Sequence, residues 1–574
     1  MVKRAYLTSA FHPFRFLRVR SVAFTAFLVL GALVSTPRAA SAQDGRIVPV
    51  EDPAYEWILR LQDRGFLTDL QPTALPYTVG EVRRALSALC AGGRGKSAVC
   101  FDGGAADRGV QGGEAAHGDA DPAARGSASS GLVPVRRWVA LIAGRLGDSG
   151  EGTRLAWSAE PIVRASSNRR LDPLRELGDR AHAYPAVLLS AAAGRNRVTA
   201  EVSARVDAYY DLDPDGLDTA LRAFARSENT YIAYESTHSA LRLGRYANHW
   251  GLPGEPGLVL SSNARTMDAV TLRLGGRRLA LRSVFAELDA ITGDGRFTGA
   301  AGDDSVASGF ERRWLATHRI DWSPSNNLTI SLFESVLFSG VGSGWSLKYL
   351  NPLQPAVLEI DNRPKNDENN GLLGIAVWMR QNRARLYGQL VIDDFDFLHA
   401  DERASFAATF SGRLVALRPG LDAGLEATAV ASRTYNTFQP EGRYVFLNRG
   451  LATQFSDYVE VAVHVRAYAD RLLEGLVLEP RLTGLWQGER DLRQPYLGLD
   501  NQFPTLLVGT VERTLRVALR TAWEPSSTVR LVVDAGVNHV AALGHRSGID
   551  RTRFSATGAI QIRIAGSRGL RLDP

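Results

Sequence analysis

A short stretch of this sequence combines side chains that could bind a polar ligand. It holds two amides, an imidazole, an indole and a guanidinium, on Asn248, His249, Trp250, Asn263 and Arg265. Amide and guanidinium groups bind hydroxyls and carboxylates, and an aromatic side chain packs on an apolar ring face. The stretch is therefore a candidate site for a sugar-like ligand. The same residues could instead fix a loop through mutual hydrogen bonds, and this alternative stays open.

A second candidate is a run in which carboxylates alternate with aromatic rings. Asp393, Asp394 and Asp396 surround Phe395, and Phe397 follows them. The run comes after an apolar segment, so we expect it at the end of a strand. There the three carboxylates would face solvent or a sugar, and a solvated rim is the simpler interpretation.

Residues 211–216 have the D-x-D-x-D-G opening of a calcium loop. Such a loop requires a bidentate glutamate at its twelfth position, where this chain has Arg222. A polar turn between two strands is the preferred interpretation. We predict neither a metal site nor a cofactor.

Motifs for catalysis are missing from the sequence. It contains no G-x-S-x-G or H-E-x-x-H, and its ten histidines are scattered. His318 or His464 could join a serine and an acid inside a barrel, but lone histidines on strands more often form structural hydrogen bonds. The sequence thus predicts a protein that is not an enzyme.

Strands are the elements that would position these residues. From about residue 154 onward apolar and polar residues alternate, as in Val198–Val206, and tight turns such as 194–197 are separated by long polar segments such as 289–312. This asymmetry is typical of an antiparallel transmembrane β-barrel, and about 420 residues fit 16 to 18 strands, with 18 favoured. Tryptophans near the expected strand ends are predicted to form girdles at the two membrane interfaces: Trp314, Trp322, Trp345, Trp378, Trp486 and Trp523. A soluble sandwich or propeller is the alternative, which the lack of a blade-length repeat disfavours.

The N-terminal part of the chain has a different character. Residues 1–42 are typical of a secretory signal peptide, with a basic start, an apolar segment and a cleavage site near Ala42. Residues 43–150 are predicted to form a helical module with a flexible Gly/Ala-rich insertion at 91–131, and residues 151–574 the barrel. Thr78 and Glu81 have the spacing of a capping box at the start of one helix of this module. Cys90 and Cys100 could form a disulfide in an exported chain, a point the sequence leaves open.

The excess of positive charge belongs to the leader. The chain has 67 Lys and Arg against 61 Asp and Glu, and six of the basic residues but no acid lie in the first 42 residues. The remainder lacks the basic excess that marks nucleic-acid-binding surfaces. We therefore expect no nucleic-acid partner, and we expect the outward apolar residues to face a lipid bilayer.

Several segments resemble the Wzi capsule assembly family. Arg245–Gly254 and Gly257–Arg265 are similar to its tryptophan-glycine loop and its L-S-x-N-A-R run, and Lys348–Pro352, Asn370–Gly374 and Leu386–Phe395 agree as well. The resemblance follows the order of the whole mature chain and is closest over residues 245–395.

The resemblance implies an 18-stranded barrel in the bacterial outer membrane, with a small helical bundle on the periplasmic side. It also implies a lectin-like, non-enzymatic role in which the protein holds exported capsular polysaccharide at the cell surface. A porin or substrate-specific diffusion channel is the alternative. The N-terminal helical module, which a simple porin lacks, discriminates between the two.

Overall fold

The computed structural model describes residues 45–91, 133–147, 153–216, 225–291, 311–339, 344–355, 369–393, 405–437, 440–492 and 505–570. The predicted signal peptide, all of the predicted insertion except Ala91, and the predicted calcium-loop position Arg222 lie outside these residues. So do Asp394 and Asp396. Cys90 is disulfide-bonded, and its partner also lies outside the described part of the chain.

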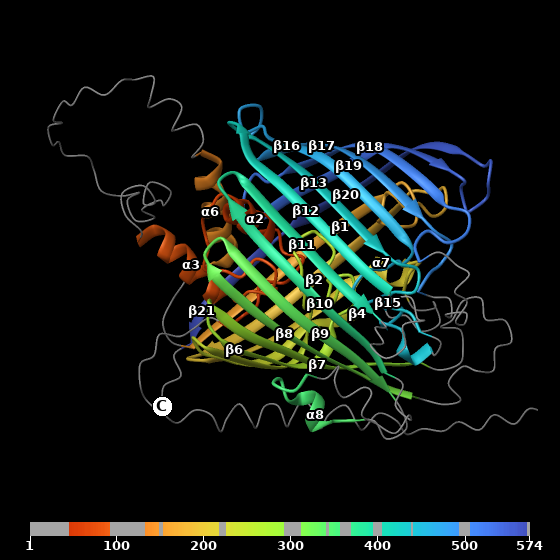
Figure 1. Ribbon diagram of the computed structural model, residues 1–574. Coiled ribbons are helices and arrows are strands. Elements are labelled where there is room, and N and C mark those ends of the chain that lie inside the picture. Colours follow the sequence, from red (N-terminus) through yellow and green to blue (C-terminus); the bar gives the residue numbers. More distant parts are fainter. Residues whose placement is uncertain are drawn as a thin grey trace, which may run out of the picture. The chain divides into compact units, whose positions relative to one another are not determined.

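The chain forms a closed, antiparallel β-barrel of 18 strands, which confirms the predicted fold class. Each barrel strand pairs with the next one along the chain, and β1 pairs with β2 on one side and with β20 and β21 on the other. Only Arg563 separates β20 from β21, so the two count as one strand of the barrel. Figure 1 shows the tilted strands of the wall.

The strands have the following bounds: β1 Thr153–Ser166, β2 His182–Arg195, β3 Val198–Asp207, β4 Ala225–Glu235, β5 Ser239–Tyr246, β6 Met267–Gly275, β7 Leu279–Ile291, β8 Glu311–Ser325, β9 Leu328–Ser339, β10 Asn369–Gln381, β11 Ala384–Asp393, β12 Ser405–Arg418, β13 Leu421–Val430, β16 Tyr458–Tyr468, β17 Leu476–Gln487, β18 Glu512–Trp523, β19 Val529–Ala541, β20 Arg551–Ile562 and β21 Ile564–Leu570. A separate hairpin joins β14 (Val445–Phe446) to β15 (Arg449–Gly450).

The two-residue period of the sequence decides which side chains face outward. On β18, Leu515 and Val517 are 51% and 61% exposed, whereas Arg516 between them is 3% exposed. Successive side chains of a strand point to opposite faces, so one face of the wall is apolar and the other carries charge. An outward apolar face is the surface that a barrel presents to lipid.

Charged side chains that point into the barrel are paired. Arg516 donates to Asn538 at 2.8 Å, Arg466 contacts Glu479 at 2.6 Å, and Arg319 contacts Asp321 at 2.7 Å. A charge removed from water is tolerated when a partner of opposite sign and additional hydrogen bonds compensate it. The charged groups in the interior of this barrel therefore largely compensate one another.

Turn chemistry separates the two ends of the barrel as the sequence predicts. Tight connections link β2 to β3, β6 to β7, β8 to β9 and β10 to β11, and Asn196 and Asn382 adopt the positive φ that two of these turns require (56° and 53°). Short connections also link β4 to β5, β12 to β13, β16 to β17 and β18 to β19, and longer ones join the remaining neighbouring strands. No helix among the described residues is long and apolar enough to cross a membrane.

Three helices form a module at the tight-turn end (Figure 1): α2 (Ala54–Asp63), α3 (Val79–Ala91) and α6 (Val133–Leu146). Their apolar faces share one core that includes Trp57, Leu61 and Trp138. The predicted capping box is present at the start of α3, where the Thr78 N–H donates to Glu81 at 2.8 Å and the Glu81 N–H donates to Thr78 at 3.1 Å.

The aromatic residues near strand ends only partly follow the expected girdles. Trp322 is 53% exposed on the outer face, as a girdle residue should be. Trp314 and Trp378 point inward and are buried, because inner apolar clusters occupy their side of the strand. The prediction of a girdle position for these two residues is wrong.

Candidate functional site

Two long connections fold into the barrel and pack on each other. The first, residues 247–266, joins β5 to β6, and the second, residues 431–457, joins β13 to β16. The Ser261 N–H donates to the Leu451 carbonyl at 2.8 Å, and the Tyr435 hydroxyl donates to the Leu258 carbonyl at 2.7 Å. We call these segments the inner loops.

The inner loops carry an apolar cluster of their own. Leu252, Leu258 and Val259 of the first loop and Leu451 of the second are completely buried, together with inward residues from strands β6 to β17. The loops therefore bring apolar residues into the lumen.

The first inner loop also reaches the helical module. Backbone hydrogen bonds run from the Leu75 N–H to the His249 carbonyl (2.9 Å) and from the His249 N–H to the Leu75 carbonyl (3.1 Å). The loop thus spans the distance between the long-loop end and the module. Trp250 lies beside this contact and is buried, and its backbone N–H donates to the Leu260 carbonyl at 2.8 Å.

His249 is fixed as a neutral imidazole. Its Nδ1 accepts from the Ser262 N–H at 3.2 Å, so Nε2 carries the proton and donates to the Leu252 carbonyl at 3.0 Å. Burial lowers the pKa of this loop histidine from 6.5 to about 4, with Arg319 adding to the effect. His249 organises the backbone of the loop and does not offer a free nitrogen to a ligand. The neighbouring Asn248 is buried as well.

Asn263 and Arg265 lie elsewhere, on a cavity of about 670 Å³. The Asn263 amide donates to the Gly450 carbonyl at 2.8 Å and to Gln454 at 3.0 Å. The Arg265 guanidinium donates to Asp213 at 2.7 Å and stacks 4.0 Å from the centre of the Tyr210 ring. Burial and the nearby Arg449 lower the pKa of Arg265. The structure thus divides the five predicted residues between a loop interior and a cavity wall.

The cavity has a composition that the sequence alone did not reveal. Its wall contains further arginines, acids and aromatic rings from strands, inner loops and the N-terminal segment: Glu51, Arg164, Arg170, Arg175, Arg205, Tyr209, Glu228, Arg449, Phe455 and Tyr458. Arg175 lies 4.6 Å from the centre of the Phe455 ring and 4.8 Å from that of Tyr458. Guanidinium groups held against aromatic rings are suited to hydroxyls, carboxylates and sugar ring faces.

The D-x-D-x-D-G segment supports this cavity. It follows the short helix α7 (Ala208–Leu212), and Asp213 pairs with Arg265 and with Arg449 (3.3 Å), while Asp215 pairs with Arg170 (2.8 Å). Because these two carboxylates pair with arginines, the ion pairs hold the cavity wall together. The described residues contain no group of three or more metal-ligating side chains.

Asp393 differs from its predicted environment. It ends β11, as expected of a strand end, but it is completely buried and accepts from the Tyr435 N–H at 2.5 Å. The inner loop that carries Tyr435 covers this strand end. The expectation that Asp393 faces solvent or sugar is wrong for this reason.

Neither inward histidine has the surroundings of a catalytic base. His318 contacts Glu334 at 2.8 Å, and His464 contacts Arg413 at 3.2 Å and Glu426 at 3.8 Å. Within the described part of the chain, neither one hydrogen-bonds to a serine or threonine hydroxyl, as activation of a nucleophile requires.

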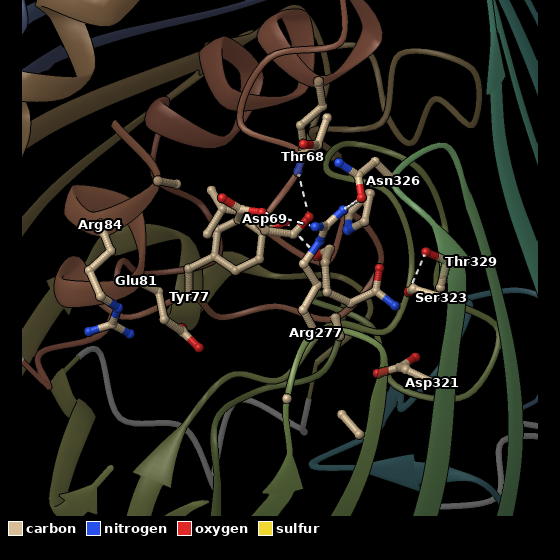
Figure 2. A pocket seen from close by; sticks show the side chains of 18 of the residues that line it. Thr68, Asp69, Tyr77, Glu81, Arg84, Arg277, Asp321, Ser323, Asn326 and Thr329 are labelled. Atoms are coloured by element: carbon tan, nitrogen blue, oxygen red, sulfur yellow. Dashed lines mark hydrogen bonds and ion pairs between the residues drawn. The ribbon is translucent and has the colours of Figure 1, made fainter. Parts of the chain in front are cut away.

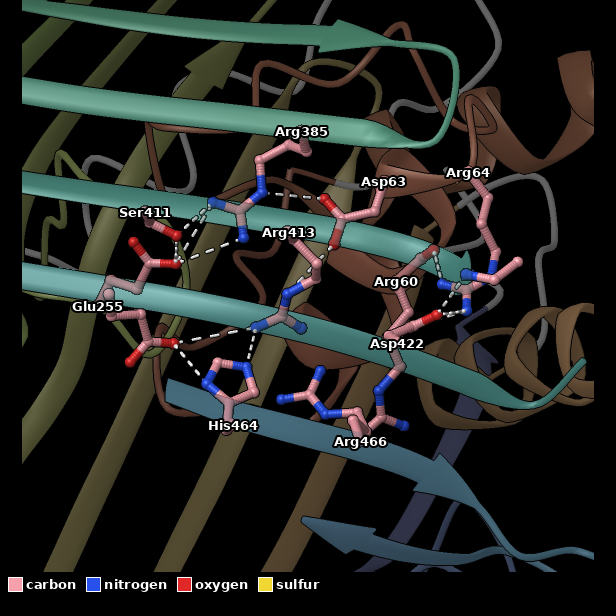
Figure 3. A network of polar contacts seen from close by, with 12 residues as sticks. Arg60, Asp63, Arg64, Glu255, Arg385, Ser411, Arg413, Asp422, His464 and Arg466 are labelled. Carbon is pink, nitrogen blue, oxygen red and sulfur yellow. Dashed lines mark hydrogen bonds and ion pairs between the residues drawn. The ribbon is translucent and has the colours of Figure 1, made fainter. Parts of the chain in front are cut away.

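A buried ion-pair network joins the first inner loop, the barrel wall and the module (Figure 3). Arg385 on β11 contacts Asp63 of α2 at 3.3 Å and Glu255 of the loop at 3.5 Å, and Ser411 on β12 donates to Glu255 at 2.7 Å. Arg64 of the module donates to Asp422 of β13 at 2.8 Å. These contacts fix the loop and the module against the same strands.

Comparison with known proteins gives a family match over part of the chain and a similar fold. Residues 184–445 match the sequence model of the capsule assembly protein Wzi family. No curated protein sequence matches this chain.

Among solved structures, the chain is similar to Wzi of Escherichia coli, described as an outer membrane protein involved in group 1 capsule assembly and a carbohydrate-binding β-barrel. The TM-score is 0.55 at 14% identity, covering 90% of this chain and 99% of Wzi. OpdQ of Pseudomonas aeruginosa and OccAB1 of Acinetobacter baumannii reach TM-scores of 0.39 and 0.42, each at 10% identity, covering 72% of this chain and 98% and 96% of theirs.

Proposed function

We propose that this chain, whose residues 184–445 match the Wzi capsule assembly family, is an outer-membrane barrel that binds exported surface polysaccharide and holds it at the bacterial cell surface without catalysing a reaction. The proposal includes the division of the chain into a leader at residues 1–42, cleaved near Ala42, a helical module at 43–150 and a barrel at 151–574. The Wzi structure similar to this chain is that of a carbohydrate-binding barrel.

The observation that carries the proposal is the cavity beside Arg265. Its wall combines guanidinium groups, carboxylates, amides and aromatic rings, and its volume of about 670 Å³ lies in the range of small-ligand pockets (roughly 300–1,000 Å³). The Arg265 side chain keeps 18% of its surface exposed although Asp213 and Tyr210 hold it. A preorganised guanidinium of this kind binds a carboxylate or hydroxyl of an acidic glycan with little loss of side-chain entropy.

The outward apolar face supports a lipid partner. Leu243, Val517 and Phe554 are each about 60% exposed on the outer wall. In water this surface would be costly, at about 25 cal/mol for each Å² of apolar area. A bilayer removes that cost.

The inner loops favour binding over diffusion. Their buried apolar cluster and the ion-pair network of Figure 3 occupy lumen that a diffusion channel would keep open to water. Planar-bilayer recording checks this point, because steady open-channel current from the purified protein would favour the channel.

The test of binding uses the full-length protein in detergent and purified acidic capsular polysaccharides. Arg265→Gln should lower the affinity at least tenfold, since a charge-assisted hydrogen bond contributes roughly 1.5–3 kcal/mol. Asp213 keeps Arg449 as its partner in this variant, so the wall should stay folded. Arg195→Gln, at an exposed tight turn, is the matched control and should bind like wild type. Binding to no polysaccharide, or an equal loss in both variants, would refute the proposal.

A further inference from the structure

A second cavity opens at the tight-turn end of the barrel, between the helical module and three tight turns. Its volume is about 410 Å³. Segment 68–77 and one face of α3 form one side, and the turns at 237–238, 276–277 and 325–326 form the other (Figure 2). Neither the family match nor the cavity beside Arg265 accounts for this pocket.

The charged groups of this pocket are paired, with one exception. Arg282 contacts Asp321 at 3.0 Å, Arg277 contacts Asp69 at 3.2 Å and Arg273 contacts Glu81 at 3.6 Å. Arg84, on the exposed face of α3, has no carboxylate within ion-pair distance among the described residues, and Figure 2 shows it at the edge of the pocket. The pocket therefore has one cation to offer to a ligand.

Polar atoms without a protein partner also gather here. Both polar atoms of the Gln71 side-chain amide and the Nε1–H of Trp378 are shielded from water and have no hydrogen-bond partner in the described part of the chain. A buried polar group left unpaired costs about 1–3 kcal/mol. After a small rotation of these two side chains, the hydroxyl groups of a ligand would pair with their polar atoms and offset that cost.

Part of the remaining wall is apolar. This part consists of aromatic, proline and alanine side chains: Pro72, Pro76, Tyr77, Ala85, Ala88 and Trp378. Such surfaces pack on the C–H faces of a sugar ring, whereas a bare inorganic anion would leave them unused.

We propose that this pocket is a second glycan site, on the module side of the barrel, which takes one or two sugar rings bearing a single carboxylate. Arg84 binds the carboxylate, and Gln71 and Trp378 bind ring hydroxyls. The choice of a glycan as ligand rests on the proposed function. The protein then contacts the same polymer in two separate cavities.

The test is a titration of the full-length protein in detergent with D-glucuronate, D-glucose and inorganic phosphate, followed by calorimetry. Ala88→Trp fills the pocket from α3 and should reduce glucuronate affinity at least tenfold. Ser87→Trp, one residue away on the same helix but outside the pocket, is the matched control and should bind like wild type. Arg84→Gln should weaken glucuronate about fivefold and leave glucose unchanged, because only the charge is lost.

The outcomes separate this inference from the proposed function. If long polysaccharide binding depends on Arg265 while Ala88→Trp binds glucuronate like wild type, the module-side site is refuted and the proposed function stands. If phosphate competes fully and glucose does not bind, the pocket is an anion site and the inference is also refuted. If glucuronate binding is lost in Ala88→Trp alone while Arg265→Gln leaves it unchanged, the inference is supported.

Discussion

Glu524 ties the helical module to the barrel, and its removal should loosen the module selectively. It lies in the tight turn between β18 and β19 and is 2% exposed. It accepts from the Trp57 indole N–H at 2.9 Å and from the Arg60 guanidinium at 3.1 Å, both on α2, and contacts Arg530 at 3.2 Å. One carboxylate thus joins two residues of the module to a strand.

The structure allows the size of the effect to be worked out. Removing one partner of a buried ion pair costs about 3–5 kcal/mol, because the remaining charge stays buried without compensation. Arg60 keeps a second contact with Glu56 at 3.2 Å, which places Glu524→Ala near the lower end, at about 3 kcal/mol. Glu474, at the neighbouring turn, pairs with Arg137 but is 82% exposed, so Glu474→Ala should cost less than about 1 kcal/mol.

Native-state hydrogen exchange of the α2 amides measures the free energy of local opening in both variants. Glu524→Ala should lower it by about 3 kcal/mol in α2 and leave the exchange of β7 and β8 unchanged, because these strands make no contact with Glu524. Equal exchange of α2 in Glu524→Ala and Glu474→Ala would refute the assignment of the anchor to Glu524. A uniform loss across the barrel would show that the module and the wall unfold together.

Two further predictions concern the lipid face and the inner loop. Val517→Arg, in the middle of β18 on the outer face, should destabilise the barrel in lipid vesicles by about 2–4 kcal/mol. The control Leu473→Arg, in a tight turn, should cost about 0–1 kcal/mol. Equal costs for the two variants in a folding titration would contradict the outward orientation of Val517 on β18. Burial lowers the pKa of His249 from 6.5 to about 4, so the unfolded chain binds the proton first as the pH falls. The free energy of unfolding that this difference in pKa contributes is fully present above pH 6.5 and is lost as the pH falls toward 4. Wild type should lose about 2 kcal/mol more than His249→Gln between pH 7 and pH 5 in urea unfolding, and an identical pH dependence in the two proteins would argue against a buried neutral imidazole.

The sequence was sufficient for the architecture because the signals for it are local. Alternation along strands, tight turns such as the one at Asn382, and the capping box of Thr78 and Glu81 each depend on residues within a few positions of one another. The same local signals failed for Trp378. Its position near a strand end is that of a girdle residue, and only the packing of the neighbouring elements shows that its side faces inward.

The candidate site could be predicted only in part, since the sequence drew attention to one inner loop without showing its partners. Asn263 and Arg265 lie on the cavity, but Glu51, Arg175 and Arg449 reach it from distant parts of the chain. Asp393 was predicted at a strand end and is there, yet the second inner loop covers it.

The sequence by itself determined the barrel, the helical module and the apolar outer face, because each follows from a short-range period or a local cap. Only the tertiary structure decided which loops enter the lumen, which arginines share the cavity beside Arg265 and where the module-side pocket opens. The physical reason is that a closed barrel brings together residues hundreds of positions apart. Burial and charge pairing then select partners that no local pattern encodes.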